Sequence, residues 1–333
     1  MADSGGTRKR SAKQNMESLK SARGPHYDGA EIIDFRLSRL ARTESTFLTL
    51  FHTIEEAGAM QPITVDVMGS QATAFLTLYL RWRDAEDRHS LLKDTWAATV
   101  MGNLDFDFTQ FRNDAYARFF VAARSRLLDE WVRRFLADNP DAIVLDLGSG
   151  FDSRVFRIDP GLGHLWYDVD FPTLIEARNR LYPERPGYFA VGASVTDPDW
   201  LEQIPGDRPV IAVADSLLMF LTPDQVRTTF RQVIDHFPRG EFVFTAYSSK
   251  TTKNKRKTDS RPFFRKYGIQ LDWTLDDIGE LARIDTRLEC LDRRSQADPR
   301  LQPGTPLWNK LLCMLVYVIP AYRYSAATLR CRF

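Results

Sequence analysis

The sequence is poor in the residues that build metal sites and disulfides. Its 333 residues include three cysteines, Cys290, Cys313 and Cys331, and five histidines. The cysteines are scattered without the C-x-x-C spacing of zinc sites, and no disulfide framework is evident, so we expect no metal and a reducing, cytoplasmic location. None of the histidines stands in a recognisable catalytic motif, so they do not predict a general base.

The sequence also lacks an excess of charge and any long hydrophobic run. Lys and Arg number 45 against 44 Asp and Glu, a net charge of +1, which argues against nucleic acid as a partner. The longest apolar run, Leu311 to Pro320, is too short to cross a bilayer. The N-terminal segment is polar and basic and has no apolar stretch typical of signal peptides. We therefore expect neither a membrane span nor an export signal.

The first hundred residues differ in pattern from the rest. Residues 1–24 are rich in Ser, Gly, Lys and Arg, which predicts a disordered tail. Apolar residues then recur at helical spacing over 30–57, and further helices are predicted over 71–83 and 91–101. The predicted organisation is a tail at 1–24, a helical region at 25–110 and a larger domain at 111–333.

Beyond residue 110, strand patterns alternate with helix patterns. A long helix is predicted over 115–137, and another begins after Leu221, where Thr222 and Gln225 match a capping box. This alternation predicts an α/β fold with a doubly wound, mostly parallel sheet. The predicted strands are 142–148, 164–170, 188–193, 209–216, 241–247 and 327–333.

The most informative stretch is Ala142–Gly150, an apolar run that ends in Asp-Leu-Gly-Ser-Gly. The run predicts a buried strand, and Gly148 and Gly150 allow a sharp turn and a ligand close to the main chain. Asp170 ends the next strand, where its carboxylate can accept hydrogen bonds from ribose hydroxyls. Together these features predict a nucleoside site, with a turn that binds no ligand as the alternative.

The residues after the turn favour S-adenosylmethionine over NAD. Ser153 fills the third position of the dinucleotide pattern G-x-G-x-x-G, and Asp152 lies where a pyrophosphate would pass. A carboxylate there would repel phosphate at close range. S-adenosylmethionine has no phosphate and carries a cationic sulfonium and amino group, so an NAD(P) oxidoreductase is the disfavoured alternative.

Three motifs resemble the leucine carboxyl methyltransferase superfamily, and more closely its bacterial polyketide O-methyltransferase branch, the tetracenomycin-type enzymes. The motifs are Leu145–Arg157, Tyr167–Pro172 and Ala214–Gln225, in the family's order. The resemblance covers roughly residues 110–333. It implies a class I methyltransferase fold: a Rossmann-like, seven-stranded sheet with an antiparallel last strand, preceded by helices in 25–110 that form a lid over the cofactor and shape the acceptor pocket.

The resemblance also implies individual site residues. Arg124 would bind the carboxylate of the cofactor, whereas Arg126 would point elsewhere on the same helix. Asp215 stands where the family often carries Glu, near the amino group of the cofactor. Ser194 and Val195 match positions that flank adenine, with Ser194 in place of a common Asp. The predicted cofactor-binding residues are Arg124, Gly148, Ser149, Gly150, Asp170, Phe171, Ser194, Val195 and Asp215.

The sequence thus predicts an S-adenosylmethionine-dependent O-methyltransferase of secondary metabolism that acts on a polyketide-like phenol or acid and releases S-adenosylhomocysteine. Two alternatives remain. One is a carboxyl methyltransferase acting on a peptide or protein terminus, which the basic segment 250–266 would suit. The other is a non-catalytic cofactor-binding scaffold. A phenol acceptor benefits from a general base and an ionised acid does not, so no catalytic residue is predicted. The acceptor's identity and the oligomeric state stay open.

Overall fold

The computed structural model describes residues 61–252, 262–301 and 304–333, without the side chains of 113–116. The predicted tail at 1–24 and the predicted helix at 30–57 lie outside the described residues. So does most of the basic segment 250–266.

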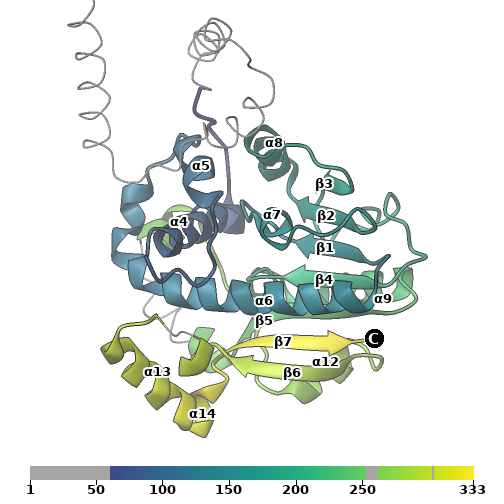
Figure 1. The fold of residues 1–333 in the computed structure, drawn as a ribbon. Helices are drawn as coiled ribbons and strands as arrows, with labels where there is room; N and C mark the ends of the chain where they lie inside the picture. The colour runs from purple at the N-terminus through teal and green to yellow at the C-terminus, as the bar shows by residue number, and fades with distance from the viewer. Residues whose placement is uncertain (1–60, 253–261, 302–303) are drawn as a thin grey trace, which may run out of the picture. The chain divides into compact units, whose positions relative to one another are not determined.

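A seven-stranded sheet forms the centre of the described chain, in the order β3-β2-β1-β4-β5-β7-β6 (Figure 1). The first five strands run parallel, and β7 runs antiparallel to both β5 and β6. This topology confirms the predicted fold class and the six predicted strands. The strands are β1 Ile143–Leu147, β2 Leu165–Asp170, β3 Tyr188–Gly192, β4 Val210–Ala214, β5 Gly240–Tyr247, β6 Glu289–Ser295 and β7 Ala326–Arg332.

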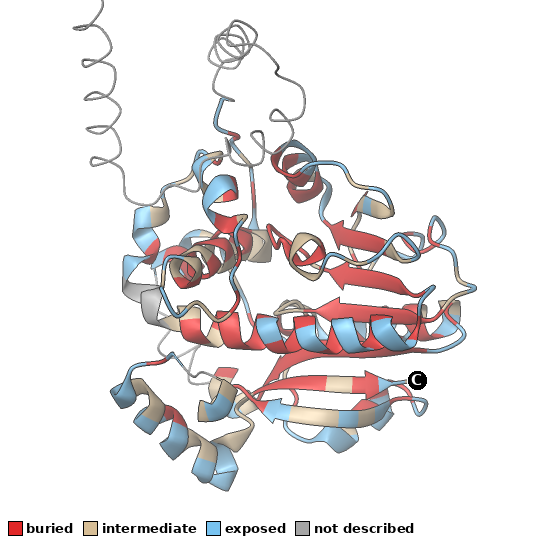
Figure 2. Cartoon of the chain, viewed as in Figure 1, coloured by how far each residue is buried: buried red, intermediate tan, exposed pale blue. Residues whose placement is uncertain are grey.

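Strand β6 is missing from the sequence prediction, and its composition explains why. Among the described strands it lies at the sheet edge and pairs with β7 alone, so it is less buried than the central strands (Figure 2). Its sequence, ECLDRRS, contains one leucine, and Leu291 is 39% exposed. An edge strand of this kind lacks the apolar run on which strand prediction depends.

Helices cover both faces of the sheet, as parallel strands require. The helix α6, Arg118–Asp138, packs on one face, and α9, Pro223–His236, packs on the other. The capping box predicted for α9 is present: the Thr222 hydroxyl accepts the Gln225 N–H at 3.3 Å, and Gln225 Oε1 accepts the Thr222 N–H at 2.8 Å. Three short elements complete this half: α7 Arg154–Ile158, α8 Pro172–Leu181 and η3 Leu218–Phe220.

The described part of the N-terminal helical region is η1 Gly69–Ala72, α4 Thr73–Ala85, α5 Ala97–Gly102 and η2 Phe108–Ala117. The helix predicted over 71–83 is confirmed by α4. The prediction over 91–101 is wrong in its first half, because the chain turns around the buried Asp84. The Asp84 carboxylate accepts the Ser90 hydroxyl at 2.7 Å and the Leu92 N–H at 3.0 Å. These local bonds compete with the helical backbone pattern.

The C-terminal part adds short helices around β6 and β7. The side chains of α13 include exposed leucines and Trp308. No helix within the described ranges is long and apolar enough to cross a membrane. These elements are α11 Pro262–Lys266, η4 Ile278–Glu280, α12 Leu281–Ile284, η5 Pro299–Leu301, α13 Leu307–Val318 and α14 Pro320–Arg323.

Candidate cofactor site

The glycine turn follows β1 directly. Gly148 and Gly150 both have left-handed backbones, with φ of 65° and 51°. A Cβ on Gly148 would lie 2.9 Å from the Leu217 Cδ1, and a Cβ on Gly150 would lie 3.1 Å from the Ala74 Cβ. Glycine is therefore required at these positions for two reasons. Its backbone adopts the left-handed conformation, and it leaves room for Leu217, in the loop after β4, and for Ala74 on α4.

Asp170, at the end of β2, is bonded to this turn. Its Oδ2 accepts the Gly150 N–H at 2.7 Å, and its Oδ1 accepts the Phe171 N–H at 2.8 Å. Burial raises the pKa of Asp170 to about 6, although both backbone N–H groups favour the carboxylate. Each oxygen keeps a lone pair for a further donor, so above pH 6 the carboxylate can accept a diol.

A cavity of about 70 Å³ lies at the carboxyl ends of β1, β2 and β4. Its walls come from the glycine turn, from the ends of β2 and β4, and from α4. The lining residues include Thr73, Ala74, Thr77, Arg81, Arg124, Asp146, Gly148, Ser149, Gly150, Asp152, Arg154, Asp170, Phe171, Asp215, Ser216, Leu217 and Phe220.

Arg124 reaches this cavity from α6. Its side chain is 7% exposed, and its Nε donates to the Asp215 Oδ1 at 2.7 Å. Ser125 donates its hydroxyl to the Asp215 Oδ2 at 2.8 Å. Arg126, two residues along the helix, is exposed, as the helical period requires. Of these two arginines, only Arg124 can meet a ligand in the cavity.

A buried network of arginines and aspartates underlies the site. Arg154 is at its centre: it donates to Asp129 at 2.8 Å, to both oxygens of Asp146 at 3.0 Å and to the Asp215 Oδ2 at 3.0 Å. Burial raises the pKa of Asp146 to about 7 in spite of Arg154. Burial would also raise the pKa of Asp215, but Arg124 and Arg154 outweigh it and lower that pKa. The network thus fixes Asp215 as an ionised carboxylate.

Asp152 belongs to the same network, which corrects one step of the sequence argument. Its carboxylate lies 2.6 Å from an Arg157 nitrogen, 3.4 Å from Arg154 and 3.6 Å from Arg81. Burial alone would raise the pKa of Asp152, but these guanidinium groups hold it well below its usual range. Because its charge is neutralised by arginines, Asp152 would not by itself repel a phosphate, so this residue does not disfavour NAD.

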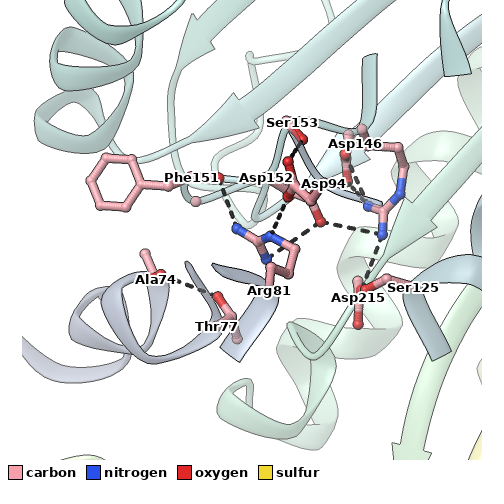
Figure 3. A network of polar contacts seen from close by, with 12 residues as sticks. Ala74, Thr77, Arg81, Asp94, Ser125, Asp146, Phe151, Asp152, Ser153 and Asp215 are labelled. Carbon is pink, nitrogen blue, oxygen red and sulfur yellow. Dashed lines mark hydrogen bonds and ion pairs between the residues drawn. The ribbon is translucent and has the colours of Figure 1, made fainter. Parts of the chain in front are cut away.

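Arg81, on α4, was not predicted to take part in the site. Figure 3 shows its guanidinium between Asp94, Asp152 and the Phe151 carbonyl. The distances are 3.1 Å from Nε to Asp94 and 2.7 Å from Nη2 to the Phe151 oxygen. These bonds fasten α4 to the glycine turn. No signal marked this residue, because an arginine in an apolar helical pattern ordinarily faces solvent.

Two hydroxyls in the cavity lack a partner. The Oγ atoms of Ser149 and Ser216 are buried and accept or donate no hydrogen bond within the described part of the chain. Both residues line the cavity. Since buried polar groups are nearly always hydrogen-bonded, these hydroxyls fit a polar ligand. A guanidinium, a carboxylate and two open hydroxyls suit a nucleoside that carries an amino acid.

Of the three remaining predicted residues, one lines the cavity and two do not. Phe171 lines the cavity and is 37% exposed. Ser194 and Val195 follow β3 but are not among the residues that line the cavity. Ser194 forms a 2.8 Å hydrogen bond with the Thr196 hydroxyl, and Val195 is buried in the core. Their predicted contact with adenine stays a prediction. Within the described residues no His, Cys, Asp and Glu side chains group to hold a metal ion.

Comparisons with known proteins find similar methyltransferases. A profile of the leucine carboxyl methyltransferase family matches residues 82–234. The chain is 35% identical, over 271 residues, to the tetracenomycin polyketide synthesis O-methyltransferase TcmP of Streptomyces glaucescens, which covers 81% of this chain and 99% of TcmP. It is 32% identical, over 236 residues, to dpfgK, an S-adenosyl-L-methionine-dependent methyltransferase of Gibberella zeae, covering 65% of this chain and 79% of dpfgK.

Solved structures share the fold. A Thermobifida fusca protein named as a methyltransferase superposes with a TM-score of 0.51 at 18% identity, covering 76% of this chain and 93% of that one. A duf574 family protein of Streptomyces avermitilis gives a TM-score of 0.50 at 14% identity, covering 75% and 99%. At these identities the likeness concerns the fold alone.

Proposed function

Because this chain belongs to the leucine carboxyl methyltransferase family and is an S-adenosylmethionine-dependent methyltransferase, we propose that it methylates an oxygen of a small natural product, a polyketide-like phenol or acid. The similarity to TcmP, which extends over 99% of that O-methyltransferase, supports this acceptor class. The observation that carries the proposal is the cavity at the carboxyl ends of β1, β2 and β4, where Arg124, Asp170 and two open serine hydroxyls meet.

In this proposal the two ends of the cavity hold opposite ends of the cofactor. Arg124 binds the carboxylate through its guanidinium, the group best suited to planar oxyanions. Asp170 accepts the ribose hydroxyls, and the turn from Gly148 to Gly150 lets the ligand approach the main chain. Ser149 and Phe171 line the same wall. The adenine extends toward Ser194 and Val195, and the amino group lies near Asp215.

Methyl transfer depends on alignment of the acceptor oxygen with the methyl group more than on acid or base groups. When bound, the cofactor supplies a methyl group on a sulfonium. The protein orients the acceptor oxygen in line with that methyl group and excludes water, which together lower the barrier. Asp146, Asp170 and Asp215 line the cavity and are held there by hydrogen bonds, and the proposal gives none of them the role of general base.

We also propose that residues 25–110 form the lid and the acceptor pocket. Support comes from α4, which belongs to that region and contributes Ala74, Thr77 and Arg81 to the cavity lining. Aromatic side chains cluster behind it, with Phe75 stacked on Phe106 at 3.9 Å between ring centres. These rings belong to the hydrophobic core that supports α4, so they hold in place the helix that lines the cavity. The cysteines are free, and a cytoplasmic location remains part of this proposal.

The test is methyl transfer from labelled S-adenosylmethionine to a panel of acceptors. The panel holds aromatic polyketide phenols, their carboxylic acids, and peptides with free C-termini. Label on a phenol or on a small acid supports the proposal. Label found on peptide termini only would favour the carboxyl methyltransferase alternative. Binding of S-adenosylhomocysteine without transfer to any acceptor would favour a cofactor-binding scaffold.

A further inference from the structure

Ser216, directly after Asp215, has an unusual backbone. Its φ is 63°, in the left-handed region that L residues other than glycine seldom adopt. Strand β5 stabilises this conformation, because the Ser216 N–H donates to the hydroxyl of the buried Thr245 at 2.7 Å. Strain of this kind persists where the surrounding structure imposes it, and it clusters at ligand sites.

The other residues with the same conformation offer an instructive contrast. Among the described residues other than glycine, Lys93 and Asp159 also have positive φ, at 56° and 51°. Asp159 ends α7 as a left-handed cap, a place where this conformation is common, and its side chain is 81% exposed. Ser216 instead lines the cofactor cavity, and its buried hydroxyl has no partner within the described residues.

Asp215 has little capacity left for the amino group of the cofactor. Its Oδ1 accepts Arg124, and its Oδ2 accepts Ser125 and Arg154. A carboxylate offers about four lone-pair sites, so three are in use. Its charge is also shared between two guanidinium groups, which weakens its attraction for a third cation. One site remains on Asp215, so an ammonium group, which has three N–H donors, has use for a second acceptor close by.

Ser216 lies where that acceptor is needed. The adjoining Leu217 is so near the glycine turn that a Cβ on Gly148 would lie 2.9 Å from it. The loop after β4 and the turn after β1 thus form one wall. Asp170, which would hold the ribose, stands on the β2 side, and Arg124, which would hold the carboxylate, contacts the β4 side. The amino group sits on the same carbon as the carboxylate, so in this placement it lies near the loop after β4, and both Arg124 and Ser216 line the cavity.

We propose that the Ser216 hydroxyl accepts a hydrogen bond from the amino group of S-adenosylmethionine and of its product, while Asp215 serves to position Arg124. This proposal rests on the cofactor placement described under the proposed function. A serine hydroxyl has two acceptor lone pairs, and an ammonium is a donor only. In this proposal the left-handed backbone of Ser216 orients its hydroxyl toward the ligand.

The test compares three ligands by titration calorimetry. S-adenosylhomocysteine carries both amine and carboxylate, 5′-methylthioadenosine carries neither, and 5′-(3-aminopropyl)thioadenosine carries the amine alone. Ser216→Ala should weaken S-adenosylhomocysteine about tenfold, since a hydrogen bond to a charged group is lost. The same substitution should also weaken binding of the aminopropyl compound, and it should change the affinity for methylthioadenosine by less than twofold. Ser216→Gly should weaken the same two ligands yet raise the melting temperature, because glycine relieves the strain.

Asp159→Gly is the matched control, since it relieves a left-handed residue away from the cavity and should leave all three affinities unchanged. If Ser216→Ala binds S-adenosylhomocysteine as tightly as the unmodified protein, or weakens methylthioadenosine equally, Ser216 does not bind the amine. If the unmodified protein fails to bind S-adenosylhomocysteine at all, the cofactor placement is wrong, and the assignment of Ser216 falls with it.

Discussion

Replacing Arg124 by alanine tests the placement of the cofactor's carboxylate. The substitution removes a guanidinium that is 7% exposed and faces the cavity. A hydrogen bond to a charged group contributes roughly 1.5–3 kcal/mol, so the dissociation constant of S-adenosylhomocysteine should rise roughly 10- to 150-fold. Asp215 keeps Arg154 and Ser125 as partners, so the fold should survive with a loss of about 1–3 kcal/mol.

The assay is titration calorimetry on folded protein, with folding checked by thermal melting. Arg126→Ala is the matched control, because Arg126 is exposed on the same helix and should change the affinity by less than about 0.5 kcal/mol. Arg124→Lys keeps the charge but loses the planar guanidinium, so its affinity for S-adenosylhomocysteine should lie between those of Arg124→Ala and Arg126→Ala. Equal affinities for Arg124→Ala and Arg126→Ala would refute the carboxylate assignment.

Three further predictions concern pH, stability and the N-terminal region. The pKa of Asp170, raised by burial to about 6, leaves the carboxylate ionised above pH 6. The affinity for S-adenosylhomocysteine should therefore fall about tenfold between pH 7 and pH 5, and Asp170→Asn should abolish that pH dependence. An unchanged affinity at pH 5 would contradict the ribose assignment. Arg154→Ala leaves Asp129 and Asp146 without their central cation, so urea unfolding should show a loss of about 3–5 kcal/mol. A loss under 1 kcal/mol would mean that the network contributes little. Deletion of residues 1–24 should leave turnover intact, and deletion through residue 60 should abolish it. A folded protein without those 60 residues that methylates at an unchanged rate would contradict the lid.

The fold was predictable because its central elements carry strong local patterns. The buried strands β1, β4 and β5 are nearly continuous apolar runs, and the start of α9 carries a complete capping box. Where the pattern is weak, prediction failed. The edge strand β6 is polar, and the start of the helix predicted over 91–101 is unwound by the bonds to Asp84.

The lining of the cavity was predictable where a residue type and a strand end coincide, as for Gly148, Gly150 and Asp170. Long-range pairing was not. Asp152 looks like a free acid in the sequence, yet it is neutralised by arginines that include Arg81, 71 positions earlier in the chain. Only the tertiary packing of α4 on the glycine turn creates that contact, and a single sequence carries no record of it.

A crystal structure with bound S-adenosylhomocysteine tests the central claim most directly. We predict the ligand's carboxylate within hydrogen-bond distance of Arg124, its ribose hydroxyls on Asp170 and its amino group on the Ser216 hydroxyl. A nucleoside bound anywhere other than the carboxyl ends of β1, β2 and β4, or a carboxylate that does not reach Arg124, would contradict the account.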